Sequence, residues 1–189
     1  MNEVYEPSED TYLLIDALRS LKRNVLKRVV EVGSGSGIVT VALAKLSDEV
    51  FAVDISYEAV KYTWRRISSS SHAGTSHVIQ GDTLSMFRDT PIFDLIVSNP
   101  PYLPIEGLRD KTIEGGIDFI KQVVAHSKSK IKDKGLLVLV ASTLTGSIDE
   151  ILFYLRMEGF NPYIKLSRKL FFEEILIIEA VKDRRDREK

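Results

Sequence analysis

A short β-branched run that leads directly into three alternate glycines constrains this chain more than any other feature. Residues 29–32 are Val-Val-Glu-Val, and glycines follow at positions 33, 35 and 37. Residues 38–46 are mostly apolar and contain neither glycine nor proline, which is typical of a packed helix. A strand, a glycine-rich turn and a helix in this order predict one unit of a parallel sheet, because parallel strands need a crossover between them.

The same alternation continues along the chain and predicts an α/β fold. Strands are expected at 29–32, 50–53, 77–80, 93–97 and 136–141, and helices at 8–22, 38–46, 57–67, 117–131 and 148–157. Right-handed crossovers between such strands produce a mostly parallel sheet with helices on both faces. The expected architecture is therefore Rossmann-like, with seven strands once the C-terminal region is included.

Two strand-like runs follow each other near the C-terminus without a helix between them. They are residues 162–166 and 171–181, and a short basic link at 167–169 joins them. This pattern predicts an antiparallel hairpin at one edge of the sheet. A length of 189 residues fits one domain, expected to span 1–182, and the highly charged residues 183–189 are expected to form a solvated tail.

The composition argues against several classes of function. The formal net charge is −1, whereas proteins that hold nucleic acid by its phosphates usually carry a basic excess, so nucleic acid is not an expected partner. There is no cysteine, and the three histidines lack ligand spacing, so no metal site is expected. No apolar run is long enough to span a bilayer and the first residues lack a signal-peptide pattern, which indicates a cytoplasmic location.

The spacing of the glycines indicates which kind of ligand the turn holds. Glycines after a first parallel strand let the backbone approach a ligand closely and leave the N–H groups of the next helix free. A dinucleotide fingerprint would place its third glycine at position 38, where this chain has Ile38. The turn therefore predicts a ligand site that differs from an NAD site.

Two aspartates follow the next two predicted strands at the same edge of the sheet. Asp54 ends the second strand, where a carboxylate can accept hydrogen bonds from ribose hydroxyls, although Asp54 or Ser56 can instead cap the following helix. Asp82 is placed to accept from an adenine amino group, with Ile55 and Leu84 as apolar walls, although a Gly-Asp pair is also common in plain turns. Together with the glycines, the aspartates favour a ligand that contains a nucleoside.

The segment Asn99-Pro100-Pro101-Tyr102 follows a buried strand and forms a stiff corner. Proline fixes its own φ angle and has no N–H, so this corner offers acceptors rather than donors. The Asn99 side-chain oxygen and the Pro100 carbonyl can accept both N–H bonds of a planar amide or amino group, while Tyr102 covers its flat face. The alternative is a strand-ending turn, because Asn-Pro and Pro-Pro are common in loops. The corner predicts a site that positions a planar nitrogen for attack.

Residues 31–37 resemble motif I of class I S-adenosylmethionine methyltransferases, in which an acidic residue precedes three alternate glycines. With the Asn99–Tyr102 corner and the segment Tyr5–Thr11, the chain resembles the HemK-like methyltransferases from about residue 5 to residue 179, in particular their archaeal and eukaryotic branch. The resemblance implies the class I methyltransferase fold and S-adenosylmethionine as the cofactor. It also implies methylation of the glutamine side-chain amide in the Gly-Gly-Gln motif of a peptide-chain release factor.

The resemblance further implies that Thr11 touches the cofactor, that Asp10 lies near the acceptor and that Asn99 orients it. Taken with the motifs, the residues expected to bind the cofactor are Thr11, Glu31, Gly33, Ser34, Gly35, Gly37, Asp54, Ile55, Asp82 and Asn99. The residues expected at the reaction site are Asn99, Pro100, Pro101 and Tyr102 for catalysis, and Asp10, Asn99 and Tyr102 for substrate binding. A loop of the family before the fourth helix is matched in part by 115–118, but Phe119 stands where the family has glycine.

For this branch the resemblance implies a small zinc-binding activator subunit that pairs with an edge of the methyltransferase sheet. In the expected strand order, residues 77–80 form that edge. An apolar edge strand is a ready site for pairing with another chain. The alternative is an ordinary edge kept soluble by its polar neighbours.

Other functions stay open at this point. Nucleic-acid methyltransferases that modify adenine N6 or cytosine N4 share the Asn/Asp-Pro-Pro-Tyr corner, and protein lysine is a further acceptor. Trp64 with Arg65 and Arg66 would suit a stacked base, but we expect Trp64 to be a core aromatic of an amphipathic helix. A partner protein that only binds the cofactor is disfavoured, because it would not need Asn99 and Tyr102.

Overall fold

The computed structural model describes residues 6–21, 26–100 and 115–183. Within these residues, the strands are β1 (Leu26–Val32), β2 (Ser47–Asp54), β3 (Ser76–Gln80), β4 (Phe93–Ser98), β5 (Ile131–Ser142), β6 (Phe160–Lys169) and β7 (Glu174–Lys182). The helices in the same residues are α1 (Glu9–Arg19), α2 (Ile38–Ala44), α3 (Tyr57–Ser68), α4 (Gly115–Lys130) and α5 (Ile148–Met157), with a 3₁₀ turn, η2, at Ala73–Thr75. Among the helices of this described part, none has both the length and the apolar content needed to cross a bilayer.

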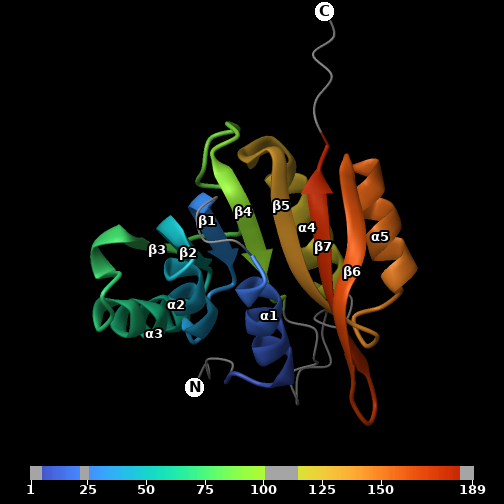
Figure 1. Cartoon of the computed structure of the whole chain (residues 1–189), viewed down its shortest axis with the longest axis horizontal. Helices are drawn as coiled ribbons and strands as arrows, with labels where there is room; N and C mark the ends of the chain where they lie inside the picture. The colour runs from blue at the N-terminus through green and yellow to red at the C-terminus, as the bar shows by residue number, and fades with distance from the viewer. Residues whose placement is uncertain (1–5, 22–25, 101–114, 184–189) are drawn as a thin grey trace, which may run out of the picture.

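The described strands form one seven-stranded sheet in the order β3-β2-β1-β4-β5-β7-β6. The first five strands run parallel, and β7 lies antiparallel between β5 and β6. Helices α1, α2 and α3 cover one face, and α4 and α5 cover the other (Figure 1). The predicted α/β fold with a C-terminal antiparallel hairpin is therefore confirmed. Because the chain builds outward from β1 to β3 and then returns to β4, the topology switches between β1 and β4, which is where open α/β sheets bind ligands.

The core lies in two layers, one on each face of the sheet. Successive residues of a strand point to opposite faces, so Val29 packs under α1 and α2 while Val30 packs under α4. Both side chains are fully buried. This double burial explains why Val29, Val30 and Val32 of the buried half of β1 are all apolar, with Glu31 as the one polar residue among positions 29–32.

The predicted link of the C-terminal hairpin is wrong by a few residues. Residues 167–169 belong to β6, and the turn is formed by Leu170–Glu173, where the Leu170 N–H donates to the Glu173 carbonyl oxygen at 2.8 Å. Leu166 and Leu170 pack against the core, whereas Ser167 and Lys169 are exposed. The basic stretch is therefore the outer face of an amphipathic strand, which explains why its composition resembles that of a turn.

Other boundaries differ from the prediction at element ends. Helix α1 ends at Arg19 rather than at residue 22, and α4 begins at Gly115, so the glycine pair predicted as a loop lies in the first turn of this helix. Strand β5 begins at Ile131 instead of residue 136. Residues 184–189 lie outside the described residues, so the domain limit at 182 and the charged tail stay predictions.

Gly37 provides a test of how the glycine turn is packed. It has a φ of 75°, and a Cβ atom at this position would lie 2.8 Å from the Thr63 Cα atom on α3. We expect Gly37→Ala to lower the free energy of unfolding by about 2 kcal/mol or more, because it adds left-handed strain and overpacking. Urea unfolding measures this change.

Gly74 supplies the matched control, because a Cβ atom added there meets no atom within 4 Å. Gly74→Ala should change the free energy of unfolding by less than about 0.5 kcal/mol. Equal losses in the two variants would contradict the packing role assigned to Gly37.

Candidate active site

The loops that follow the first four strands lie next to one another at the carboxyl edge of the sheet. The Gly33 N–H donates to the Val53 carbonyl at 2.8 Å, and the Gly81 N–H donates to the Asp54 carbonyl at 2.9 Å. A Cβ atom added to Gly33 would lie 3.9 Å from the Asn99 carbonyl oxygen. The predicted ligand turn and the predicted acceptor corner are therefore neighbours, directly at the topological switch.

The three glycines of the turn have different tasks. Gly33, Gly35 and Gly37 have φ angles of 80°, 49° and 75°, a region that favours glycine. A Cβ atom at Gly35 would meet no atom within 4 Å, so the space beside its backbone is open. Gly33 and Gly35 thus leave room for a ligand, whereas Gly37 leaves room for α3.

Helix α3 fixes the turn from behind. The Thr63 hydroxyl lies 3.0 Å from the Ser34 hydroxyl, and the Arg66 Nε–H donates to the Ser36 carbonyl at 2.7 Å. Ser34 is buried in this contact, so its side chain points toward α3. The expectation that Trp64 is a core aromatic is wrong, because its side chain is 60% exposed. The hydrogen bonds of Thr63 and Arg66 show that α3 stabilises the glycine turn.

Glu31 carries a buried carboxyl group below the turn. The Thr40 hydroxyl on α2 donates to one of its oxygens. Burial raises the pKa of Glu31 to about 8, the hydrogen bond from Thr40 opposes this rise, and the nearby carboxylate of Asp54 adds to it. The pKa of a carboxyl group buried in this way is sensitive to any cationic group that binds near it.

Asp54 organises the ends of two loops. Its Oδ2 atom accepts from the Gly35 N–H and its Oδ1 atom from the Ser56 N–H, both at 2.9 Å. The cap of α3 is Ser56, whose hydroxyl accepts from the Ala59 N–H at 3.4 Å. Each carboxylate oxygen has a further lone pair, so Asp54 can still accept from ribose hydroxyls. The neighbouring Ile55 side chain is 71% exposed and offers an apolar surface at this edge.

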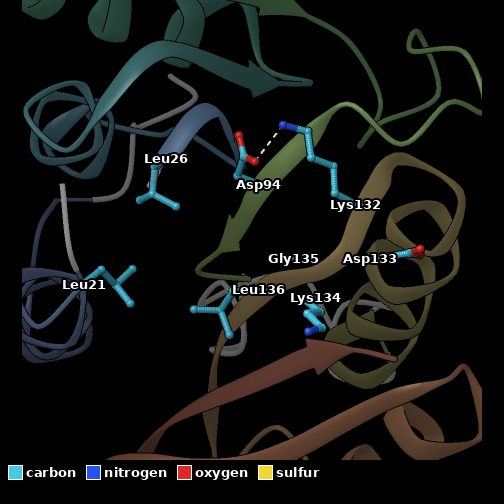
Figure 2. Close-up of a pocket in the computed structure, with 8 residues that line it drawn as sticks. All are labelled: Leu21, Leu26, Asp94, Lys132, Asp133, Lys134, Gly135 and Leu136. Carbon is cyan, nitrogen blue, oxygen red and sulfur yellow. Dashed lines mark hydrogen bonds and ion pairs between the residues drawn. The ribbon is translucent and has the colours of Figure 1, made fainter. Parts of the chain in front are cut away.

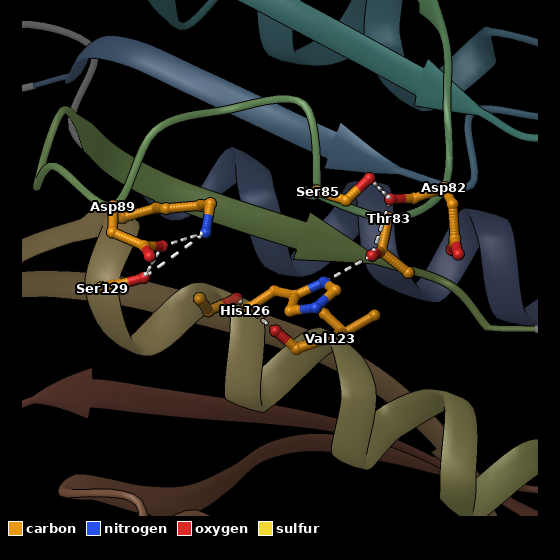
Figure 3. A network of polar contacts seen from close by, with 9 residues as sticks. Asp82, Thr83, Ser85, Asp89, Val123, His126 and Ser129 are labelled. Atoms are coloured by element: carbon orange, nitrogen blue, oxygen red, sulfur yellow. Dashed lines mark hydrogen bonds and ion pairs between the residues drawn. The ribbon is translucent and has the colours of Figure 1, made fainter.

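A polar network holds the loop around Asp82 against α4 (Figure 3). Thr83 has a positive φ of 48°, and its hydroxyl lies 2.6 Å from the Nδ1 atom of His126 and 2.8 Å from the Asp82 carbonyl oxygen. Gln122, one helical turn before His126, lies 3.5 Å from an Asp82 carboxylate oxygen. The network fixes a strained turn whose Asp82 side chain faces solvent.

His126 and Gln122 were missed by the sequence analysis. No local pattern distinguishes them, because Asp118 and Lys130, one turn away on the same face of α4, are also polar. Leu84 is fully buried in the core, so it does not line an open ligand surface as the sequence analysis expected.

Asp10 and Asn99 form the reaction corner. Asp10 is buried at the start of α1, and its Oδ1 atom accepts from the Thr11 N–H at 2.6 Å and from the Ser8 hydroxyl at 2.7 Å. Its Oδ2 atom accepts from the Asn99 Nδ2 amide at 2.9 Å. The Thr11 hydroxyl also approaches Asp10, at 3.2 Å. The N-terminal segment is thereby joined directly to the end of β4.

The Asn99 carboxamide has a fixed orientation in this corner. A carboxylate only accepts hydrogen bonds, so the NH₂ group of Asn99 must face Asp10. Its Oδ1 atom is buried and has no hydrogen-bond partner among residues 6–21, 26–100 and 115–183. Pro100 is buried beside it, whereas the predicted residues Pro101 and Tyr102 lie outside the described residues. A buried acceptor of this kind is costly unless an incoming N–H satisfies it.

A hollow of about 410 Å³ lies at the opposite end of the sheet (Figure 2). It is lined by Leu26 at the start of β1, Leu136 on β5, and the ion pair between Asp94 and Lys132, which measures 2.6 Å. The other Asp94 oxygen accepts backbone N–H groups of β1. Asp94 and Lys132 are therefore paired with each other, and the hollow is remote from the candidate site. Within the described part of the chain, no group of three or more His, Asp or Glu side chains is placed to hold a metal ion.

The fold and the carboxyl edge together define a class I methyltransferase that uses S-adenosylmethionine. The residues present fit this cofactor, because Gly33 and Gly35 leave space for it, Asp54 retains acceptor capacity and Ile55 offers an apolar wall. The chain matches the methyltransferase small domain over residues 8–153.

Comparison with known proteins narrows this class. A protein of Methanocaldococcus jannaschii named as a protein N5-glutamine methyltransferase is 32% identical over 94% of this chain and 91% of its own length. The human methyltransferase HEMK2 is 28% identical over 96% of this chain and 91% of its own length. The Mtq2–Trm112 complex of E. cuniculi, described as responsible for methylation of the eRF1 termination factor, superposes with a TM-score of 0.74 at 28% identity, covering 96% of this chain and 99% of the other. The chain belongs to the methyltransferase small domain family and, within it, to the protein N5-glutamine methyltransferases.

The buried carboxyl of Glu31 predicts a pH-dependent stability. Its pKa in the folded chain is about 8, against 4.5 for an exposed glutamate, so the folded state binds more protons and stability falls as the pH rises through this window. Between pH 6 and pH 9 the contribution of Glu31 to the free energy of unfolding should fall by roughly 2–3 kcal/mol. We expect Glu31→Gln to flatten this fall in urea unfolding at a series of pH values.

The half-buried Glu58 on α3, which pairs with Lys61, is the matched control, and Glu58→Gln should leave the slope of stability against pH unchanged. If Glu31→Gln keeps the wild-type slope, Glu31 does not titrate in this range.

Proposed function

We propose that this enzyme transfers a methyl group from S-adenosylmethionine to the side-chain amide nitrogen of the glutamine in the Gly-Gly-Gln motif of a peptide-chain release factor. The names of the relatives from M. jannaschii and E. cuniculi support this acceptor. The observation that carries the proposal is the orientation of the Asn99 carboxamide, with its Nδ2 atom held by Asp10 and its Oδ1 atom buried and available.

This orientation is complementary to a glutamine side chain. A primary amide is planar and carries two N–H donors, so one of them can satisfy the Asn99 Oδ1 atom while the other faces the Pro100 carbonyl. Because the amide is held in one plane, the face of its nitrogen can be directed toward Gly33, where the cofactor would lie. Bound S-adenosylmethionine would supply an electrophilic methyl carbon.

The residues of the corner act by positioning rather than by proton transfer. An amide nitrogen is a weak nucleophile, and fixing its distance and direction is the main contribution a protein can make. Asp10 keeps Asn99 in one orientation, and Pro100 limits the backbone that carries it. Of the residues expected at the cofactor from the sequence, we retain Thr11, Glu31, Gly33, Gly35, Asp54, Ile55, Asp82 and Asn99. The Ser34 side chain and Gly37 instead pack against α3. Since release factors act where translation takes place, we also place the enzyme in the cytoplasm.

A test of the acceptor uses mass spectrometry of a cognate release factor after incubation with the enzyme and the cofactor. We expect one methyl group on the Gly-Gly-Gln peptide. Asn99→Ala should lower kcat by about a hundredfold or more, because it removes an oriented hydrogen bond at the reacting group. Binding of S-adenosylmethionine should change by less than about threefold.

The matched control is Asn161→Ala, because Asn161 is an exposed asparagine of β6 that bonds to Asp183, away from the corner. Equal turnover by wild type and Asn99→Ala would refute the site. Methylation of a nucleic acid, with none on the release factor, would refute the acceptor.

We further propose that β3 is the docking edge for a small zinc-binding activator subunit. In the described part of the chain β3 pairs with β2 only, which agrees with the predicted edge position. The Gly81 N–H points to β2, so by the alternation of a strand the N–H groups of Val78 and Gln80 point outward. These groups are available to a strand of another chain. The complex that contains Mtq2 supports the presence of a partner.

Gln80→Pro tests this edge without disturbing the ladder to β2. Proline removes an outward N–H and places its ring on the docking side, so we expect the affinity for the activator to fall by roughly tenfold or more. Isothermal titration calorimetry measures the loss. Gln80→Ala keeps the N–H and should bind nearly as tightly as wild type. Unchanged binding by Gln80→Pro would place the activator elsewhere.

A further inference from the structure

Two adjacent phenylalanines are almost completely exposed at the tip of the β6–β7 hairpin. Phe171 is 93% exposed and Phe172 is 83% exposed. Their rings contact each other edge to face, with centroids 4.7 Å apart. Two neighbouring aromatic side chains with this exposure form an apolar patch that is costly in water unless a partner covers it.

The tip is a built structure. Its turn is closed by the hydrogen bond between Leu170 and Glu173, and the Leu170 side chain packs against the core. The Ser142 hydroxyl at the end of β5 donates to the Glu173 carboxylate, and the Glu174 N–H donates to the Thr143 hydroxyl at 3.0 Å. Since both sides of the turn are fixed, the two phenyl rings are presented to solvent from a rigid support.

The hairpin lies at the same edge of the sheet as the reaction corner. Arg168 of β6 forms an ion pair with Glu9, and Glu9 directly precedes Asp10, which holds Asn99. Phe171 follows Arg168 by three residues, which is roughly 10 Å of extended chain. Figure 1 shows the hairpin extending beyond the carboxyl end of β5, on the side where α1 begins. The aromatic tip thus stands beside the proposed acceptor site.

We propose that Phe171 and Phe172 dock the acceptor protein, by contacting an apolar part of the release factor next to the glutamine that is methylated. This inference rests on the proposed function. Aromatic side chains at a protein surface are frequent hot spots of protein–protein interfaces. The proposed activator edge, β3, lies at the opposite side of the sheet from β6, so an activator on β3 leaves the tip available to the substrate.

The tip would also explain how a small corner selects one protein. The contacts of Asn99 recognise any planar amide and therefore carry little information about the rest of the acceptor. A second, apolar contact at the hairpin tip adds binding free energy only for a protein with a matching apolar surface. The contact at the tip therefore affects the affinity for the whole acceptor protein, whereas the alignment of the amide depends on Asp10 and Asn99.

Steady-state methylation of a full-length release factor by the complex with the activator tests this inference. We expect the double variant Phe171→Ala/Phe172→Ala to raise KM for the release factor by roughly tenfold or more, with kcat at saturation within about twofold of wild type. The affinity for S-adenosylmethionine should be unchanged. Because both side chains are exposed, thermal unfolding should also match wild type.

Phe153→Ala is the matched control, because Phe153 is a 63% exposed phenylalanine on α5. Its KM should equal that of wild type. An unchanged KM in the double variant overturns the inference, as does a fall in kcat at constant KM, which would assign the tip to the alignment of the amide. A change in self-association at constant KM would assign the tip to a second copy and also overturn it. If wild type leaves the release factor unmethylated, the proposed function itself fails, and this result is distinct from equal activity of wild type and variant.

Discussion

The hydrogen bond between the Asn99 amide and the Asp10 carboxylate is the interaction on which the reaction corner depends. It joins residues 89 positions apart and connects the first helix to the end of β4. Asp10 is buried, and donors from Ser8 and Thr11 compensate its charge on the side of the helix. Its other oxygen, Oδ2, accepts from the Asn99 amide, and this contact sets the direction of the Asn99 oxygen. The geometry of the acceptor corner thus depends on the docking of α1 as well as on Pro100.

The carboxyl edge of the sheet, where the ligand is expected, is stiff because hydrogen bonds from within the protein fix its loops. Asp54 holds the N–H of Gly35, Thr63 and Arg66 hold the second half of the glycine turn, and His126 contacts the hydroxyl of Thr83. None of these contacts requires a ligand. The site is therefore largely formed in advance, so little conformational entropy is lost when a cofactor binds.

Local patterns predicted the elements well where one residue type decides the backbone. The glycines after β1 and Pro100 after β4 restrict the backbone by their own conformational limits, so the glycine turn and the end of β4 were predictable. Predictions failed where orientation depends on distant contacts. The basic stretch of β6 looked like a turn because its inward leucines are separated by polar residues. The exposure of Trp64 depends on how α3 rotates to grip the glycine turn, which periodicity does not determine. His126 pairs with Thr83 across 43 residues, and no local signal indicates such a contact. The nearness of Asp10 to the acceptor was an implication of the family resemblance, and the residues alone did not predict its bond to Asn99.

The position of β7 has a consequence for how the enzyme is made. The last strand inserts between β5 and β6, and its residues Ile175 and Ile177 share a core layer with Leu14 and Leu18 of α1. The helix that aligns Asn99 therefore has its full packing surface only after β7 has been synthesised. A nascent chain without β7 already contains the residues of the glycine turn, but its α1 does not yet have the complete surface against which it packs.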